Sequence, residues 1–146
     1  MTYYAVIDTN VIVSSLMMWD SIPADVLNHV YHKKIVPIVN VDILKEYEEV
    51  LKRGKFNFSM NKIYNVITFF KKRGIFIDSV DVITNCVKDP KDVVFYQVTM
   101  EIRKKENAYL ITGNIKHFPK ETFVVTPRQM LDIIENDNCS KIDKLW

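Results

Sequence analysis

Apolar runs of strand length alternate with helical patterns along almost the whole sequence. Strands are expected at residues 4–7, 35–39, 75–77, 108–112 and 123–125, and helices at residues 9–18, 23–33, 41–53, 60–73, 90–105 and 127–136. Alternation of this kind favours a parallel sheet that helices cover on both faces. The sequence therefore predicts an α/β fold, a three-layer α/β/α sandwich with a central, mainly parallel sheet.

One domain accounts for most of the chain. Its 146 residues fit a single domain, and no repeat or shift in composition marks a boundary. We expect this domain to occupy residues 1–136 and to be followed by a C-terminal tail, residues 137–146, that has no clear pattern. Within the second strand, Pro37 indicates an edge of the sheet or the end of a strand, because proline cannot donate to a ladder.

The composition argues against a membrane protein or a secreted one. No apolar run reaches the ~18 residues that a membrane span requires, and no basic and apolar leader opens the chain. Cys86 and Cys139 form neither a CxxC motif nor a disulfide framework, which favours a reducing compartment. We therefore expect a cytoplasmic protein without a membrane segment. The net charge of +2 permits a polyanionic substrate without demanding one.

Acidic side chains follow several of the expected strands. They are Asp8 after the first strand, Asp42, Glu46, Glu48 and Glu49 in the helix after the second, and Asp89 and Asp92 in the stretch KDPKD before the long helix. In a parallel α/β sheet the carboxyl ends of the strands lie at one edge, where ligands bind. We therefore expect these acids to meet at that edge, together with Asn114 after the fourth strand.

Among the glutamates of the third expected helix, Glu46 is the best placed. The apolar stripe of this helix consists of Ile43, Leu44, Tyr47, Val50 and Leu51. At about 100° per residue, Glu46 and Glu48 flank that stripe, whereas Glu49 points away from it. Glu46 is also nearer to the start of the helix, and hence nearer to the end of the preceding strand.

Carboxylates that converge on one point raise each other's pKa values, and a divalent cation removes this penalty. Oxygen ligands suit Mg²⁺ or Mn²⁺, which can activate water and clamp a phosphodiester for in-line attack. Each acid also has an ordinary structural role open to it. Asp8, Asp89 and Asp92 suit the start of a helix, and Glu46 could pair with a basic neighbour on a solvated face.

The sequence contains, in this order, the stretches VIDTNVIVSSL, ILKEYEEVLKR, DPKDVVFYQVTM and AYLITGNIKHFP. Taken together, these four stretches resemble the PIN-domain ribonucleases. The likeness is greatest to the bacterial branch of toxins from toxin–antitoxin pairs. It covers almost the whole chain, since FVVTPRQMLDII resembles the closing strand and helix of that branch. The resemblance implies a metal-dependent endoribonuclease that cleaves RNA phosphodiesters by metal-activated water, acting as a toxin with a cognate antitoxin as its partner.

The resemblance also implies which residues form the site. The catalytic metal ligands fall on Asp8, Glu46 and Asp92, and Asp89 is a further ligand from the Asp-Pro-x-Asp stretch. The expected supporting residues are Asn10, Thr112 and Asn114. Asn114 stands where many members carry an aspartate. Its neutral side chain weakens the case for a second metal ion, because affinity for a hard cation rises with ligand charge.

Residues outside the acidic set are candidates for contacts with partners. Lys116 and His117 are candidate RNA contacts, although His117 could equally pack beside Phe118. The resemblance implies that the early helices form a homo-oligomer or an antitoxin groove. The run Met17-Met18-Trp19 is a candidate for that surface, since methionine-rich patches suit adaptable partners.

Two other hypotheses remain open. The first is a degenerate PIN domain that binds RNA or a protein without metal, and Asn114 is the residue that motivates it. The second is a phosphotransfer or receiver-type domain with Asp8 as the nucleophile or phosphoacceptor. Asn10 stands where a haloacid-dehalogenase-type enzyme would need a second aspartate, and no lysine follows the fourth strand before Lys116.

Overall fold

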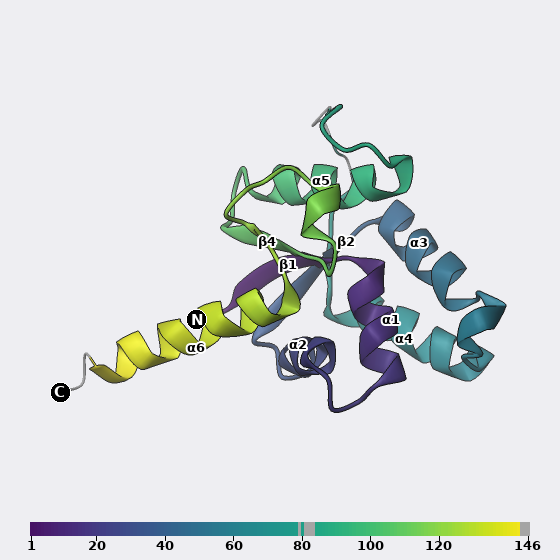
Figure 1. The fold of residues 1–146 in the computed structure, drawn as a ribbon, viewed down its shortest axis with the longest axis horizontal. Coiled ribbons are helices and arrows are strands. Elements are labelled where there is room, and N and C mark those ends of the chain that lie inside the picture. The colour runs from purple at the N-terminus through teal and green to yellow at the C-terminus, as the bar shows by residue number, and fades with distance from the viewer. Residues whose placement is uncertain (79, 81–83, 144–146) are drawn as a thin grey trace.

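The computed structural model describes residues 1–78, 80 and 84–143, which form a five-stranded parallel sheet with helices on both sides (Figure 1). The strands are β1 (Tyr3–Ile7), β2 (Ile35–Val39), β3 (Ile75–Phe76), β4 (Ala108–Ile111) and β5 (Val124–Val125), in the order β3-β2-β1-β4-β5. All neighbouring strands are parallel. The predicted α/β fold is therefore confirmed, with a sheet that is wholly rather than mainly parallel.

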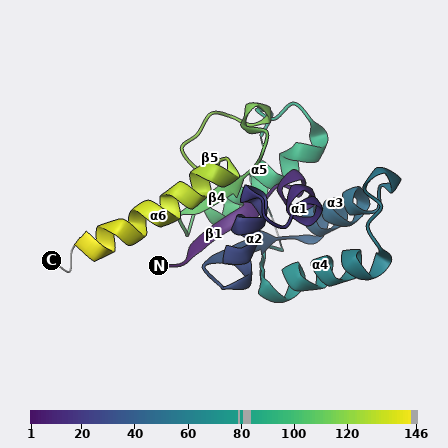
Figure 2. The same cartoon turned by 60° about the horizontal axis from the view of Figure 1, so that its bottom comes forward.

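Six α-helices in the described ranges surround this sheet. They are α1 (Thr9–Met17), α2 (Ile22–Tyr31), α3 (Val41–Leu51), α4 (Met60–Arg73), α5 (Pro90–Ile102) and α6 (Pro127–Asp143). α5 packs on β1 and β4, while α1, α2 and α6 lie together on the other side of the sheet (Figure 1, Figure 2). α3 packs against α4, which contacts β2. None of the helices in the described part of the chain is long and apolar enough to cross a membrane.

Capping side chains fix where two of these helices begin. Oδ1 of Asn40 accepts a hydrogen bond from the amide of Ile43 at 2.8 Å, and Oγ of Ser59 accepts one from the amide of Lys62 at 3.1 Å. Both residues are of types that favour the N-cap, because their side-chain oxygens can accept from the free amides of the first turn. Because α3 starts immediately after Asn40, its first turns stay close to the carboxyl edge of the sheet.

Pro37 lies in an interior strand, so the expectation of an edge strand is wrong. β2 has β1 on one side and β3 on the other, and Pro37 lies opposite Ala5 of β1. β3 pairs only with Ile38 and Val39 of β2. The proline is tolerated because it lies outside that short ladder, where its missing N–H breaks no bond to β3.

α6 is longer than the sequence predicts. Its pattern predicts an end at Asn136, but the helix continues to Asp143. The hydroxyl of Tyr3 donates a hydrogen bond to the carboxylate of Asp137, which ties the extended helix to the start of β1. A local pattern cannot reveal a bond between residues so far apart in the chain. The division into a domain over residues 1–136 and a tail stays a prediction.

The centre of the sheet forms the interior of the protein. Residues 5–7 of β1 and Leu110 and Ile111 of β4 have no exposed surface. The first polar residues beyond these strands, Asp8 and Thr112, are also buried. The fold therefore places a carboxylate and a hydroxyl inside the protein at the carboxyl edge of the sheet.

Candidate active site

Asp8 and Thr112 are neighbours because they follow two paired strands. β1 and β4 are in register with Ile7 opposite Ile111. The amide of Asp8 donates to the carbonyl oxygen of Ile111 at 2.9 Å, and Oγ1 of Thr112 donates to Oδ2 of Asp8 at 2.7 Å. Asp8 is only 5% exposed and Thr112 is not exposed at all. The threonine hydroxyl therefore fixes the orientation of a buried carboxylate.

Asp8 also occupies the residue before α1, where an aspartate could cap the helix. The backbone N–H groups of Thr9 and Asn10 favour its charged form, but neither makes a well-formed capping hydrogen bond to its side chain. The carboxylate bonds Thr112 instead. Helix capping alone does not account for an acid at this position.

Asn114 joins this pair through its backbone. Its amide donates to Oγ1 of Thr112 at 3.0 Å, and the residue itself is exposed. The hydroxyl of Thr112 therefore accepts from Asn114 and donates to Asp8. The neutral side chain at position 114 adds no charge to the carboxylates around Asp8.

Tyr47 anchors α3 to the end of β1. The apolar stripe predicted for this helix is buried in full, and Tyr47 has no exposed surface. Its hydroxyl donates a hydrogen bond to the carbonyl oxygen of Ile7, the residue before Asp8. Its ring packs against those of Phe70 in α4 and Phe95 in α5, with centroids 5.2 and 6.3 Å away. This anchor fixes the position of the adjacent Glu46.

The glutamates of α3 have different surroundings. Glu46 is half-buried and faces the carboxyl edge of the sheet, where it lines a pocket with Asp8. Glu48 lies on the surface and pairs with Lys52 at 2.9 Å. Glu49 is exposed. Of the three, Glu46 is thus the one that lies beside the end of β1.

The start of α5 contributes Asp89 and Asp92. Oδ1 of Asp89 accepts a hydrogen bond from the amide of Lys91 at 2.9 Å, so this side chain caps the helix. Asp92 lies in the first turn, and its Oδ2 is 3.5 Å from Nδ1 of His117. The two carboxylates therefore have separate local contacts, although they approach the same space.

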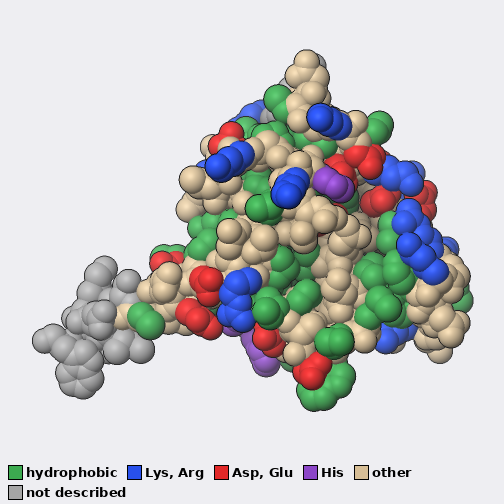
Figure 3. Space-filling view, in the orientation of Figure 1, with side chains coloured by type: hydrophobic (Ala, Val, Ile, Leu, Met, Phe, Trp, Pro, Cys, Tyr) green, Lys and Arg blue, Asp and Glu red, His purple; other side chains and the backbone are tan. Residues whose placement is uncertain are grey.

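A pocket of about 170 Å³ brings these acids together. The predicted site residues that line it are Asp8, Asn10, Glu46, Asp89, Asp92 and His117, and Arg53 and Lys91 also line it. The acids come from three parts of the chain, the end of β1 and the helices α3 and α5. Thr112 supports the pocket through Asp8, whereas Asn114 and Lys116 do not line it. The space-filling view shows acidic side chains beside a histidine on this side of the molecule, with Lys and Arg side chains nearby (Figure 3).

Burial is the main reason why three of these carboxyl groups hold their protons more tightly. It raises the pKa of Asp8, of Glu46 and of Asp92. The charge of Asp92 raises the pKa of Asp8 further, while the hydrogen bond from Thr112 opposes the rise. The charge of Asp89 likewise raises the pKa of Asp92. The acids therefore disfavour one another's charged forms, and a cation among them would relieve this repulsion.

The donor set fits a hard cation. Carboxylate oxygens from four residues converge here beside the imidazole of His117. Oγ1 of Thr9 lines the same pocket and is buried without a hydrogen-bond partner among the described residues. Within the described residues, no group of three His, Cys, Asp or Glu side chains is arranged to hold a metal ion as it stands. Glu46 and Asp92 are only half-buried, which leaves room for a change of rotamer around an ion.

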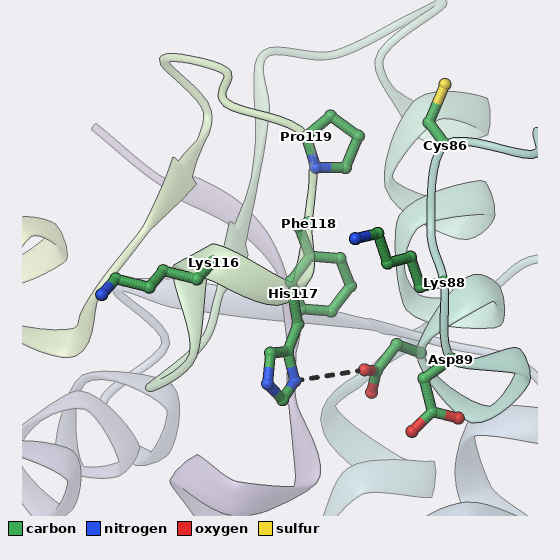
Figure 4. A pocket seen from close by; sticks show the side chains of 8 residues that line it. Cys86, Lys88, Asp89, Lys116, His117, Phe118 and Pro119 are labelled. Carbon is green, nitrogen blue, oxygen red and sulfur yellow. Dashed lines mark ion pairs between the residues drawn. The ribbon is translucent and has the colours of Figure 1, made fainter.

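A larger pocket of about 530 Å³ adjoins the acidic one (Figure 4). The two share Asp89, Asp92 and His117 as lining residues. Lys116 lines the larger pocket, but its ammonium group points away from the other cation there, Lys88 (Figure 4). Of the two candidate RNA contacts, His117 therefore faces the acids and Lys116 lies at the rim.

The sequence placed Tyr47 in an apolar stripe but did not reveal that its hydroxyl anchors α3 to Ile7. A tyrosine among buried aliphatic residues must place its hydroxyl against a polar partner, which is the signal that could have identified it. Sequence reasoning also missed Arg53, Lys88 and Lys91 as lining residues of the two pockets. No signal in the sequence shows where such long side chains point.

A family model described as PIN domain matches residues 4–116. The chain is also similar to an uncharacterized protein of Methanocaldococcus jannaschii, with 29% identity in a match that covers 89% of this chain and 90% of the relative. No solved structure matches the chain. Because that relative is archaeal, these matches support the domain family and not the bacterial branch in particular.

Proposed function

Because the chain belongs to the PIN domain family, whose members are generally nucleases, we propose that it is a metal-dependent endoribonuclease. The observation that carries this proposal is the meeting of Asp8, Glu46, Asp89 and Asp92 in one pocket at the carboxyl edge of the sheet. These acids come from separate elements, and their charges repel one another. Such an arrangement is costly unless a cation or a reaction uses it.

Asp8, Glu46 and Asp92 would hold Mg²⁺ or Mn²⁺, with Asp89 as a further ligand. The bound cation would activate water and stabilise charge on the phosphate. Thr112 keeps the carboxylate of Asp8 oriented through its 2.7 Å hydrogen bond, and Tyr47 holds α3 in place beside it. Arg53 and Lys91 line the same pocket and supply positive charge for the RNA backbone.

Cleavage of a labelled, partly structured RNA tests this proposal. The purified protein is assayed with Mn²⁺, Mg²⁺ or EDTA, alongside Asp8→Asn and the control variant Asp132→Asn, which removes an exposed acid of α6. We expect cleavage that requires metal, is lost in Asp8→Asn and persists in Asp132→Asn. Equal cleavage in EDTA, or by Asp8→Asn, would contradict the proposal.

A toxin role with a cognate antitoxin extends this proposal, and the four ordered sequence motifs support it. Induced expression in a bacterial host should arrest growth, and expression of Asp8→Asn should not.

The exposed side chains of Met17, Met18 and Trp19 suit an antitoxin or a second copy of the chain. Light scattering after gel filtration should then show a homo-oligomer that Trp19→Ser weakens.

We place the protein in the cytoplasm, since Cys86 and Cys139 are both unpaired.

A catalytically degenerate PIN domain that binds RNA or a protein is the second candidate. Two observations favour it: position 114 carries a neutral, exposed residue, and no metal-holding group stands assembled among the described residues. This candidate predicts binding of RNA that is equal with Mn²⁺ and with EDTA, and no cleavage with either.

A further inference from the structure

The 530 Å³ pocket beside the acids has the size and lining of a ligand site. Small-molecule sites have volumes of roughly 300–1,000 Å³ and combine apolar walls with a few polar groups. Here Pro119 and the exposed ring of His117 form one side, together with the small exposed part of the otherwise buried Phe118, and Lys88 and Asp89 lie opposite (Figure 4). The proposed cleavage chemistry uses none of the side chains of Lys88, Phe118 and Pro119.

Lys88 gives this pocket its positive charge. Figure 4 shows its ammonium group extending across the pocket toward Phe118 and Pro119, whereas Lys116 points away. The exposed ring of His117 and a cation on the other side of the pocket match one nucleotide, whose flat base needs a wall and whose phosphate needs a positive charge. Proteins that bind single-stranded nucleic acids use this same combination.

The position of the pocket specifies which nucleotide it would take. Asp89, Asp92 and His117 form a wall common to this pocket and the acidic one. A nucleotide in the larger pocket would therefore place its neighbouring phosphate among the acids. We propose that this pocket binds the unpaired nucleotide next to the phosphate that is cut, with the base against Pro119 and the exposed ring of His117 and a flanking phosphate at Lys88.

This inference rests on the proposed endoribonuclease function and adds a requirement to it. A base in a Watson–Crick pair is stacked within a helix and cannot enter a side pocket without leaving the stack. The protein must therefore act on single strands, loops or ends, and must reject a continuous duplex. Lys88 should make the affinity for RNA depend on salt to the extent expected of about one phosphate contact.

Binding and cleavage are measured separately to test the inference. Fluorescence anisotropy in EDTA follows a labelled 12-nucleotide unpaired RNA, and the same strand in a duplex, with wild type, Lys88→Gln and Lys88→Arg. The matched control is Lys105→Gln, an exposed lysine just beyond the other end of α5. The same four proteins are then assayed for cleavage of the unpaired strand with Mn²⁺.

We expect Lys88→Gln to weaken binding of the unpaired RNA about fivefold and to lower the slope of log affinity against log salt by about 0.7, as one lost phosphate contact does on a single strand. Lys88→Arg should retain binding, Lys105→Gln should match wild type, and the duplex should bind at least about tenfold more weakly. Unchanged binding by Lys88→Gln, equal binding of the duplex, or no binding of RNA by wild type would overturn the inference. Absence of cleavage by wild type overturns the proposed function alone, and the binding results then still decide for or against the pocket.

Discussion

The hydroxyl of Thr112 donates a 2.7 Å hydrogen bond to the carboxylate of Asp8, a residue 104 positions earlier in the chain. The parallel pairing of β1 with β4 makes this bond, because the two residues directly follow opposed strand ends. Both are buried, so the bond satisfies a carboxylate that water cannot reach freely.

Thr112→Val should therefore destabilise the protein by about 1–3 kcal/mol, the cost of leaving a buried polar group unpaired. The hydrogen bond lowers the pKa of Asp8, so its loss should raise that pKa further and reduce metal-dependent cleavage. Urea unfolding at neutral pH measures the loss of stability. Thr112→Ser keeps the hydroxyl and should lie close to wild type, and a Thr112→Val protein as stable as wild type would refute this role.

Tyr47→Phe tests the anchor between α3 and β1. It removes the hydroxyl that donates to Ile7 and should lower the free energy of unfolding by about 0.5–1.5 kcal/mol. It should also reduce cleavage, because Glu46 is the adjacent residue. Tyr64→Phe makes the same chemical change in a side chain that is 70% exposed, and it should change neither quantity. Equal effects of the two substitutions would show that the buried bond has no special role.

Glu46 and Glu48 provide a direct test of which face of α3 carries the chemistry. Glu46→Gln removes a charge from the acidic pocket and should reduce the cleavage rate by about 100-fold, a part of the several kcal/mol that a catalytic cation supplies. Glu48→Gln breaks only a surface pair with Lys52 and should change the rate less than about twofold. Initial rates at saturating Mn²⁺ measure both. A larger loss of rate in Glu48→Gln than in Glu46→Gln would mean that Glu48, and not Glu46, belongs to the active site.

The raised pKa values of the acids predict how the metal-free protein responds to pH. A carboxyl whose pKa is higher in the folded state binds more protons there than in the unfolded state, between its ordinary value and the raised one. Folding is therefore penalised as the pH rises through that window. Asp8 is the most deeply buried of the three, and burial is the largest cause of its shift.

Asp8→Asn should consequently be more stable than wild type at neutral pH without metal, and the difference should vanish below the ordinary pKa of an aspartate. Chemical unfolding of both proteins from pH 3 to pH 8 in EDTA gives this difference directly. Asp132→Asn, a change at an exposed position, should show no such trend. A wild type more stable than Asp8→Asn throughout would mean that the buried charge is compensated within the protein alone.

The parts of the site that the sequence predicts are those set by local pattern and strand order. The strand before Asp8, the buried stripe of α3 and the cap at Asn40 all follow from short-range rules. The rule that parallel strands end at one edge then brings the acids together. Interactions across the chain do not follow from those rules. The bond from Tyr47 to Ile7, the bond from Tyr3 to Asp137 and the direction of Lys88 all depend on tertiary packing.

Calorimetric titration of the metal-free protein with Mn²⁺ tests most directly whether the acids of this pocket form one cation site. Asp8→Asn, Glu46→Gln and Asp92→Asn are titrated beside wild type, with Asp132→Asn as the control. We predict that wild type and the control bind Mn²⁺ alike and that each pocket variant loses at least about tenfold in affinity, because affinity for a hard cation follows ligand charge. Equal binding by all five proteins, or none by wild type, would contradict the account.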